Sequence, residues 1–323
     1  MQGYLLMSNA VITSVGVYLP EFVATNDELS KTVDTNDEWI KSHTGICERR
    51  LVKDDALTTA DIGFFAAKNA LEKSGISALE IDGIIAGTMS PDKTFPALSC
   101  TIQAKLGCEQ AFAFDITAAC GFIPPALNTA SLMIKAGQAK HILIVGAEIC
   151  SRIVDWSDRN TCVLFGDGAG ALLVSADDST TRGFVSSALS ANGNLANILY
   201  LNTLGKQDSF LRMEGTAVYK LAVTELGNIT QKALERAGLS LSDIDLFVPH
   251  QANTRIIQSV GKRLGLPAEK VFVNVDRYGN TSSASIPIAL YEAEKAGVLK
   301  RGMLVALAAI GGGMNWGCVL IRW

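Results

Sequence analysis

The chain has few charged residues, no basic run and no long hydrophobic run, and each shortage excludes a class of protein. Charged side chains make up 19% of the 323 residues, and the formal net charge is −4. A general nucleic-acid-binding protein is therefore not expected. The sequence also lacks a run of about 18 uninterrupted apolar residues, so it predicts no membrane-spanning helix.

Paired metal-ligand and disulfide motifs are missing as well. The seven cysteines are scattered, odd in number and without any C-x-x-C spacing. This pattern argues against a disulfide framework and against a zinc site. The N-terminal stretch "MQGYLLMSNAVITSVG" has no basic segment followed by a sustained apolar run. We expect reduced thiols, a cytoplasmic location and no bound metal.

What the chain does contain is an internal repeat. Residues 70–85, "ALEKSGISALEIDGII", match residues 233–248, "ALERAGLSLSDIDLFV", without a gap at an offset of 163 (233 − 70). The same offset relates "IPPAL" from 123 to "IPIAL" from 286, and "HILIVGAE" from 141 to "LVALAAIG" from 304. One offset that serves three separated segments indicates two related halves.

Each half reads as alternating helices and buried strands. The matched segments contain a helix, a glycine stop at Gly75 or Gly238, and then a short apolar strand. Such alternation predicts a duplicated, layered α/β fold with parallel or mixed sheets. The hydrophobic content of 48% suits one large core or two similar ones. We place the halves at residues 1–177 and 178–323, with the boundary in the polar segment Asp177 to Arg182.

Cys120, in "DITAACGFIPPAL", is a candidate nucleophile. A lone free cysteine is more often a small buried apolar side chain. Here it follows a predicted strand, has only small neighbours (Ala118, Ala119 and Gly121), and precedes a predicted helix. The unpaired N–H groups of a helix N-terminus would stabilise a thiolate. The sequence therefore favours the reactive interpretation over the structural one.

His250 and Asn280 are the polar residues that could assist such a nucleophile. His250 ends the apolar strand of "IDLFVPHQAN", at the edge where open α/β sheets place their sites, although a lone histidine there is often a solvated turn residue. Asn280, in "RYGNTSSAS", could be a simple turn or cap. Its repeat position, which is shared with Thr117 near the candidate nucleophile, argues for a functional role beyond a turn or cap. His43 and His141 have no comparable context.

Two glycine-rich segments remain. "FGDGAGALLV" fits a loose dinucleotide-binding pattern, but a strand rather than a helix follows, so we interpret it as a tight turn between two strands. Gly311 to Gly313, in "AAIGGGMNWG", end a strand. These glycines suit a hairpin turn, and they would also allow a backbone N–H to approach a reacting carbonyl.

Five ordered motifs carry a family resemblance: "TAAC", "FGDGAGA", "VPHQAN", "RYGNTS" and "GGGMNWG". With them the chain resembles the thiolase superfamily, and within it the β-ketoacyl-acyl-carrier-protein synthase III family that starts fatty-acid synthesis. The resemblance implies a homodimer with the αβαβα thiolase fold and a Cys120, His250 and Asn280 site. It also implies an oxyanion hole from the N–H groups of Cys120 and Gly312, and condensation of a short acyl-coenzyme A with malonyl-acyl carrier protein, with no cofactor beyond the thioester substrate.

Further positions match the family one at a time. Trp39, in "TNDEWIKSHTGI", resembles the ring that stacks on the adenine of coenzyme A, with Arg159 on its other side. Phe95 resembles the residue that crosses the dimer and bounds the primer pocket. Arg255 and Lys262, seven apart on one helix, resemble the basic patch that docks the acyl carrier protein, although a solvated helix face has the same pattern.

The chain departs from the family in two places, and other functions stay open. His43 stands where the family commonly has Arg, and Pro124 and Pro125 alter the segment after the nucleophile. One alternative is a thiolase-fold acyltransferase or a tailoring condensing enzyme of secondary metabolism that uses another acceptor. A papain-like protease shares the order Cys, His, Asn but would need the C-G-[SA]-C-[WY] signature, which is missing. A non-catalytic carrier-binding protein would be expected to lack Cys120.

Overall fold

Two β-sheets form the centre of the computed structural model, which describes residues 8–178, 181–202 and 209–323. The first sheet has the strand order β1 (Asn9–Tyr18), β7 (Gly168–Asp177), β6 (His141–Glu148), β4 (Gly83–Gly87) and β5 (Phe112–Asp115). The second has the order β11 (Leu246–Pro249), β12 (Leu304–Gly311), β13 (Asn315–Arg322) and β8 (Gly183–Ala191). The predicted boundary segment lies between β7 and β8, and its residues 179–180 lie outside the described residues.

The sheets are mixed, with parallel pairing at the centre of each repeat. β4 pairs in parallel with β5 and β6, and β11 pairs in parallel with β12, whereas β1, β7, β8 and β13 pair antiparallel. Every residue of β4 and of β12 is buried. Such strands are apolar on both faces and therefore need cover on both sides.

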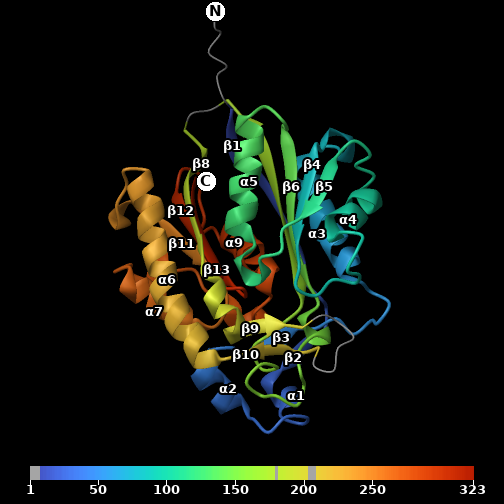
Figure 1. Ribbon diagram of the computed structural model, residues 1–323, viewed down its shortest axis with the longest axis vertical. Coiled ribbons are helices and arrows are strands. Elements are labelled where there is room, and N and C mark those ends of the chain that lie inside the picture. The colour runs from blue at the N-terminus through green and yellow to red at the C-terminus, as the bar shows by residue number, and fades with distance from the viewer. Residues whose placement is uncertain (1–7, 179–180, 203–208) are drawn as a thin grey trace, which may run out of the picture.

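Helices supply that cover in three layers. α3 (Thr59–Ser74) and α4 (Leu98–Leu106) pack on the outer face of the first sheet, and α6 (Gly215–Arg236) and α7 (Thr254–Arg263) on that of the second. α5 (Ile123–Lys135) and α9 (Ser285–Lys295) lie between the sheets, in a core shared by strands of both halves. Figure 1 shows these layers from α3 and α4 on the right to α6 on the left. The order αβαβα confirms the predicted fold class.

The repeat reappears as matched structural elements. The helix, glycine and strand of the matched segments are α3, Gly75 and β4 in one half and α6, Gly238 and β11 in the other; both glycines have a left-handed backbone. Short 3₁₀ turns, η2 (Ala119–Gly121) and η7 (Ser282–Ala284), precede the two central helices. Ala119 and Ser282, which stand at the same repeat position, both have positive φ, 46° and 47°. The two turns face each other across the interface between the halves, where Cys120 touches Ser282.

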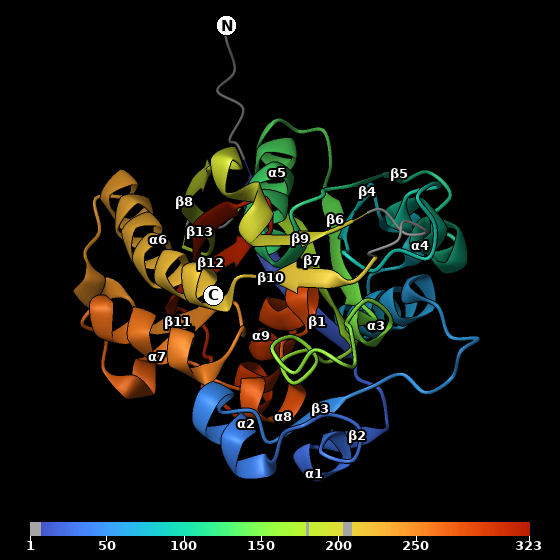
Figure 2. The same cartoon turned by 60° about the horizontal axis from the view of Figure 1, so that its bottom comes forward.

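Shorter elements gather at one end of the molecule. They are β2 (Val23–Thr25), α1 (Asn26–Leu29), α2 (Asp37–Thr44), β3 (Glu48–Arg50), β9 (Leu199–Leu201), β10 (Leu211–Met213), α8 (Val275–Tyr278), and the 3₁₀ turns η3 (Cys150–Arg152) and η4 (Gly193–Ile198). The 3₁₀ turns η1 (Ala78–Glu80), η5 (Leu241–Asp243) and η6 (Ala268–Lys270) instead lie near the starts of β4 and β11. Figure 2 shows α2 beside α7, and β3 beside α8. N-terminal segments thus lie against C-terminal ones. No helix among the described residues is long and apolar enough to cross a membrane.

The glycine-rich segment from Phe165 differs from its predicted form. It is not a tight turn between two strands, because the residues before it form turns and β7 begins only at Gly168. Phe165 instead forms an isolated parallel β-bridge with Asn280, and Gly166 N donates to Asn280 O at 3.1 Å. A periodicity argument along the sequence could not find this pairing, because its partner lies in the other half of the chain. The segment ties the first half to the loop that carries Asn280.

Candidate active site

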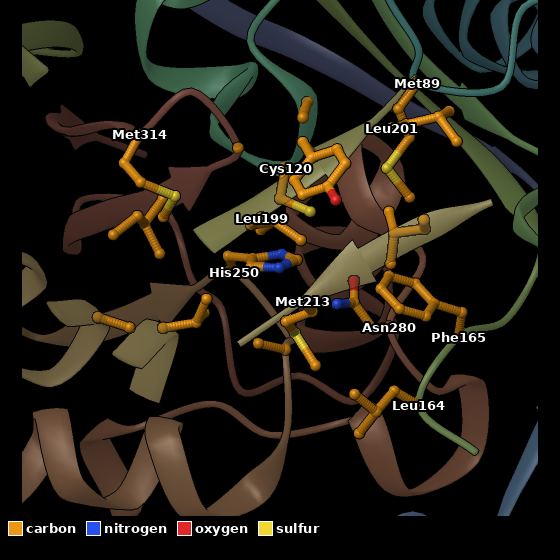
Figure 3. Close-up of a pocket in the computed structure, with 18 of the residues that line it drawn as sticks. Met89, Cys120, Leu164, Phe165, Leu199, Leu201, Met213, His250, Asn280 and Met314 are labelled. Carbon is orange, nitrogen blue, oxygen red and sulfur yellow. The ribbon is translucent and has the colours of Figure 1, made fainter. Parts of the chain in front are cut away.

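Cys120, His250 and Asn280 line a single cavity of about 880 Å³ between the two halves. Figure 3 shows the three side chains around a common space. Leu199 and Met213, from β9 and β10, cover them with apolar groups. A largely apolar cavity with a few convergent polar groups is the usual form of a small-molecule site. The structure thus brings together all three residues predicted as catalytic.

The Cys120 thiol is deeply buried and hydrogen-bonded. It lies on η2 directly before α5, is 7% exposed, and its Sγ donates to Ser282 Oγ at 3.3 Å. Burial raises the pKa of the Cys120 thiol to about 12; nearby Glu148 raises it further and Ser282 lowers it. The resting site therefore holds a neutral thiol at neutral pH.

This neutral thiol differs from the thiolate that the helix N-terminus predicted. The first turn of α5 contains Pro124 and Pro125, which have no N–H group. Gly121 N and Phe122 N already donate to Ala118 O and Ala119 O. Few N–H donors are left to stabilise a thiolate, so the burial of the sulfur decides its pKa and raises it. Deprotonation must accompany substrate binding or reaction.

His250 is held as a neutral imidazole. It follows β11, is 3% exposed, and its Nδ1 shares a 2.7 Å hydrogen bond with Ser285 Oγ. Burial lowers the pKa of His250 to about 4. Ser285 Oγ also accepts from Gln251 N at 3.4 Å, which leaves its own proton free for Nδ1. This arrangement favours the tautomer with its proton on Nε2, a neutral donor for a substrate oxygen.

Asn280 is fixed from both sides by backbone contacts. Its Oδ1 accepts from Ser282 N at 2.8 Å, and its own N–H donates to Leu164 O at 2.8 Å. The side chain is 6% exposed. Because Oδ1 is engaged, the Asn280 NH₂ group is the part that remains for the cavity. Asn280 thus makes the local turn contact that the sequence allowed, and it also lines the site.

The predicted substrate-binding residues fall in two places. The Trp39 ring on α2 has the Arg159 guanidinium 4.9 Å away and stacks on His43 with ring centroids 4.3 Å apart. His43 lines the cavity, which places this cluster beside its entrance. Phe95 is 83% exposed and is not among the residues that line the described cavity of its own chain.

The remaining predicted residues lie at the cavity rim and on α7. Gly312 lines the cavity and follows Gly311, which packs against the backbone of Cys120 and Gly121; its role in an oxyanion hole stays a prediction. Arg255 lines it too, with its guanidinium 5.9 Å from the Tyr219 ring, and Lys262 is exposed one heptad further along α7. The described residues contain no cluster of three or more His, Cys, Asp or Glu side chains that could hold a metal ion.

The sequence analysis missed the polar residues that support the site. Ser282 contacts Cys120, Ser285 contacts His250, and Glu148 accepts from Ser283, the neighbour of Ser282. Two signals could have found some of them: the offset of 163 pairs Ala119 with Ser282 and Cys120 with Ser283, and Glu148 is a carboxylate at the end of a mostly apolar strand.

Comparisons with known proteins agree on one family. The family model of 3-oxoacyl-[acyl-carrier-protein (ACP)] synthase III matches residues 114–193. The model of the C-terminal part of the same family matches residues 234–323. The β-ketoacyl-[acyl-carrier-protein] synthase III of Xanthomonas campestris pv. campestris is 48% identical over 321 residues, covering 97% of this chain and 98% of that protein. That of Aquifex aeolicus is 46% identical, covering 97% and 99%.

Solved structures give the same answer. The 3-oxoacyl-[acyl-carrier-protein] synthase III of Aquifex aeolicus superposes with a TM-score of 0.93 at 45% identity, covering 97% of this chain and 100% of that one. The enzyme from Pseudomonas aeruginosa has a TM-score of 0.93 at 37% identity, with 98% of both chains covered. The priming β-ketosynthase of the R1128 polyketide pathway has a TM-score of 0.91 at 32% identity, covering 98% and 96%.

Proposed function

Since the chain belongs to the 3-oxoacyl-[acyl-carrier-protein] synthase III family of condensing acyltransferases, we propose that its Cys120, His250 and Asn280 carry the condensation that starts fatty-acid synthesis. The substrates are a short acyl-coenzyme A and malonyl-acyl carrier protein, and the product is a 3-oxoacyl-acyl carrier protein. The observation that carries the proposal is the convergence of a thiol, a neutral imidazole and an amide in one apolar cavity.

The first half-reaction is acyl transfer to sulfur. Cys120 Sγ attacks the thioester carbonyl, an S–C bond forms, and the donor's thiol leaves. A covalent intermediate divides a difficult condensation into two easier transfers. The backbone N–H groups of Cys120 and Gly312 are the proposed donors to the carbonyl oxygen, whose charge grows in the transition state.

The second half-reaction is decarboxylation and carbon–carbon bond formation. The malonyl group loses carbon dioxide, and the enolate oxygen that develops accepts hydrogen bonds from His250 Nε2 and the Asn280 amide. Both donors are neutral in the resting site, so neither must lose or gain a charge to act. The enolate carbon attacks the acyl-cysteine, and the Cys120 thiolate that leaves takes up one proton. Labelled acyl transfer and labelled carbon dioxide release, measured separately, test this division of roles.

Carrier docking is assigned to Arg255 and Lys262 on α7. Both are exposed, and their spacing puts them on one face of an amphipathic helix whose other face is buried. Arg255 also lines the cavity, so a carrier bound there would have its prosthetic arm beside the entrance. We expect the double change Arg255→Glu and Lys262→Glu to raise the KM for the carrier substrate and to weaken its salt dependence.

A charge-matched control separates docking from a general change in net charge. Lys68 and Lys140 are exposed and distant in sequence from α7. Changing both to Glu alters the net charge equally and is expected to leave the KM for the carrier substrate near its parent value. Equal effects in the two double variants, or none in either, would identify α7 as an ordinary solvated face.

A homodimer is part of the proposal because it gives Phe95 a role. The ring is 83% exposed in a single chain, which is unusual for a Phe. In a dimer it would reach the partner's cavity and limit the length of the primer. We expect Phe95→Thr to widen the range of acyl donors toward longer chains, by about 0.8 kcal/mol for each methylene that becomes buried. A parent enzyme that accepts long and short donors equally would contradict this, and acylation rates across a donor series measure it.

The donor site is assigned to the Trp39, His43 and Arg159 cluster. An aromatic ring with a guanidinium on its face suits a planar base and its adjoining phosphates. This supports coenzyme A as the donor carrier, bound as substrate without a further cofactor. The seven free cysteines, five of them buried, suit the reducing cytoplasm in which we place the reaction.

A further inference from the structure

Arg49, the middle residue of β3, carries a fully buried guanidinium. It is 0% exposed, and no acidic side chain forms an ion pair with it among the residues that the structure describes. Burial lowers the pKa of Arg49 to about 10, so the group keeps its charge at neutral pH. Burying a charge without a countercharge is costly unless hydrogen bonds compensate. The hydrogen bonds of Arg49 therefore show what the charge is used for.

The guanidinium fork joins β3 to two other segments of the chain. Nη1 donates to Asn26 Oδ1 at 2.7 Å and to Ala24 O at 3.3 Å. Nη2 donates to Val163 O at 2.9 Å. Because the guanidinium is planar, its donors point in fixed directions. The position of the Val163 carbonyl is thus set relative to Asn26.

The Asn26 end of this fork is itself firmly held. Asn26 is 1% exposed, and its Nδ2 donates to Ile46 O at 2.8 Å and to Asp37 Oδ1 at 2.9 Å. Asp37 opens α2 and pairs with Lys41 one turn later, at 2.8 Å. The fork therefore starts from a group that cannot move freely. Its other end can in turn fix Val163.

The segment fixed in this way is the one that holds Asn280. Directly after Val163, Leu164 O accepts from Asn280 N at 2.8 Å, and Gly166 N donates to Asn280 O at 3.1 Å. Figure 3 shows Leu164 near Asn280, and both line the cavity. One short segment thus binds the Asn280 backbone through its N–H and its carbonyl. A shift at Val163 would move both of these partners.

The stem of Arg49 also packs against the turn that carries Asn280. A Cβ added at Gly166 would lie 3.1 Å from Arg49 Cβ, and one added at Gly279 would lie 3.3 Å from it. Gly279 ends α8, has a φ of 63°, and directly precedes Asn280. Figure 2 shows β3 beside α8. Arg49 thus acts on the Asn280 turn twice, by its fork through Val163 and by its stem at Gly279.

We propose that Arg49 is a positioning residue that holds the Asn280 amide where the enolate oxygen forms, a role that rests on the function proposed above. Ser282 N orients the amide within its own loop, by donating to Asn280 Oδ1 at 2.8 Å, and Arg49 fixes where that loop lies. Arg49 is not among the residues that line the described cavity, so it acts only through Asn280. Acylation of Cys120 uses backbone donors and does not depend on it.

Arg49→Met keeps an unbranched apolar stem and removes the fork. We expect carbon dioxide release from the malonyl substrate to slow by roughly 10- to 100-fold, since a small displacement of a positioned group can cost about 100-fold in rate. Single-turnover acylation of Cys120, measured at saturating acyl-coenzyme A, should stay near the parent's rate. Equal losses in the two half-reactions would overturn the proposal.

A double-mutant cycle shows whether the effect passes through Asn280. In an Asn280→Ala background the amide that Arg49 positions is gone, so Arg49→Met should slow carbon dioxide release no further. An Arg49 that only stabilises the fold would slow the reaction by the same factor in both backgrounds. Equal factors would therefore refute the positioning role.

Arg49→Lys separates the charge from the fork. The lysine keeps a positive charge, but a single ammonium cannot reproduce the planar donors that reach Asn26 and Val163 together. Carbon dioxide release should remain slowed, as in Arg49→Met. A lysine variant with the parent's rate would show that charge alone suffices, and the assigned geometry would be wrong.

Ile62→Ala is the control for a general loss of stability. Ile62 is 0% exposed on α3, at the outer face of the first sheet. Removing its side chain should lower the thermal midpoint, because it leaves a cavity in the core. It should leave both half-reactions near the parent's rates. A selective loss of carbon dioxide release in this variant would attribute the effect of Arg49→Met to a loosened fold and overturn the proposal.

Hydrogen exchange tests the positioning without any substrate. The Asn280 N–H, which bonds Leu164 O, should exchange roughly tenfold faster in Arg49→Met than in the parent, the effect of losing about one charge-assisted hydrogen bond of local stability. It should exchange at the parent's rate in Ile62→Ala. An unchanged rate in Arg49→Met would overturn the proposal. A parent that is not acylated would contradict the proposed function, whereas the exchange rate judges Arg49 alone.

Discussion

Replacing His250 or Asn280 with Ala should slow carbon dioxide release from the malonyl substrate by roughly 100- to 1,000-fold, the usual effect of losing one oxyanion donor. Each side chain is the proposed neutral N–H donor to the enolate oxygen, and each is held in place by a hydrogen bond, His250 by Ser285 and Asn280 by the Ser282 backbone. Acylation of Cys120 should fall only modestly, because that step uses backbone donors. Single-turnover acyl transfer, measured beside labelled carbon dioxide release, gives both numbers.

The order of the two effects is what distinguishes the mechanisms. If His250 instead deprotonates Cys120, His250→Ala would slow acylation most, and carbon dioxide release would fall only because less acyl-enzyme forms. His141→Ala is the control, because His141 opens β6 and bonds Ser175 far along the strand from the cavity. It should leave both half-reactions near the parent's rates. An acyltransferase to an alcohol or amine would release no carbon dioxide even in the parent.

Cys120→Ala should abolish acylation altogether. Incubation of the parent with a short acyl-coenzyme A is expected to add one acyl group per chain in an intact-mass spectrum, and the variant should gain none. Cys120 is the one cysteine among those that line the described cavity, and its sulfur lies among the groups that would bind the thioester carbonyl.

The exposed thiols provide the control for this result. Cys47 and Cys100 are the two exposed cysteines, and they would react first if acylation were merely chemical. A variant with Cys47→Ser and Cys100→Ser should retain the full adduct. An adduct of the same mass on Cys120→Ala would show that the nucleophile has been misassigned.

The layered fold could be predicted because the repeat supplies long-range information. Periodicity places helices and strands locally, but the single offset that matches α5 with α9 and β6 with β12 also says that the two halves share one architecture. The glycine-rich segment from Phe165 was misread because its partner, Asn280, lies in the other half. Local patterns carry no record of such a pairing.

The site was predictable only in part. Cys120, His250 and Asn280 stand at strand ends and helix starts, where sequence alone marks them. The state of the thiol was not predictable, because it depends on burial and on Glu148, which no local pattern connects to Cys120. Ser282 is likewise 162 residues from the sulfur that it touches. Phe95 could be matched to a family position, but a single chain leaves it on the surface.

The positive φ values of Ala119 and Ser282 set the stability of the protein against the geometry that its active site needs. A non-glycine residue in this conformation costs about 1–3 kcal/mol, whereas glycine adopts it without steric strain. Selection for thermal endurance alone would therefore drive both positions toward glycine. At Ser282 that drift would remove the hydroxyl on the thiol, and at Ala119 it would loosen the turn that aims the sulfur. A more heat-resistant descendant of this protein has to gain its stability elsewhere.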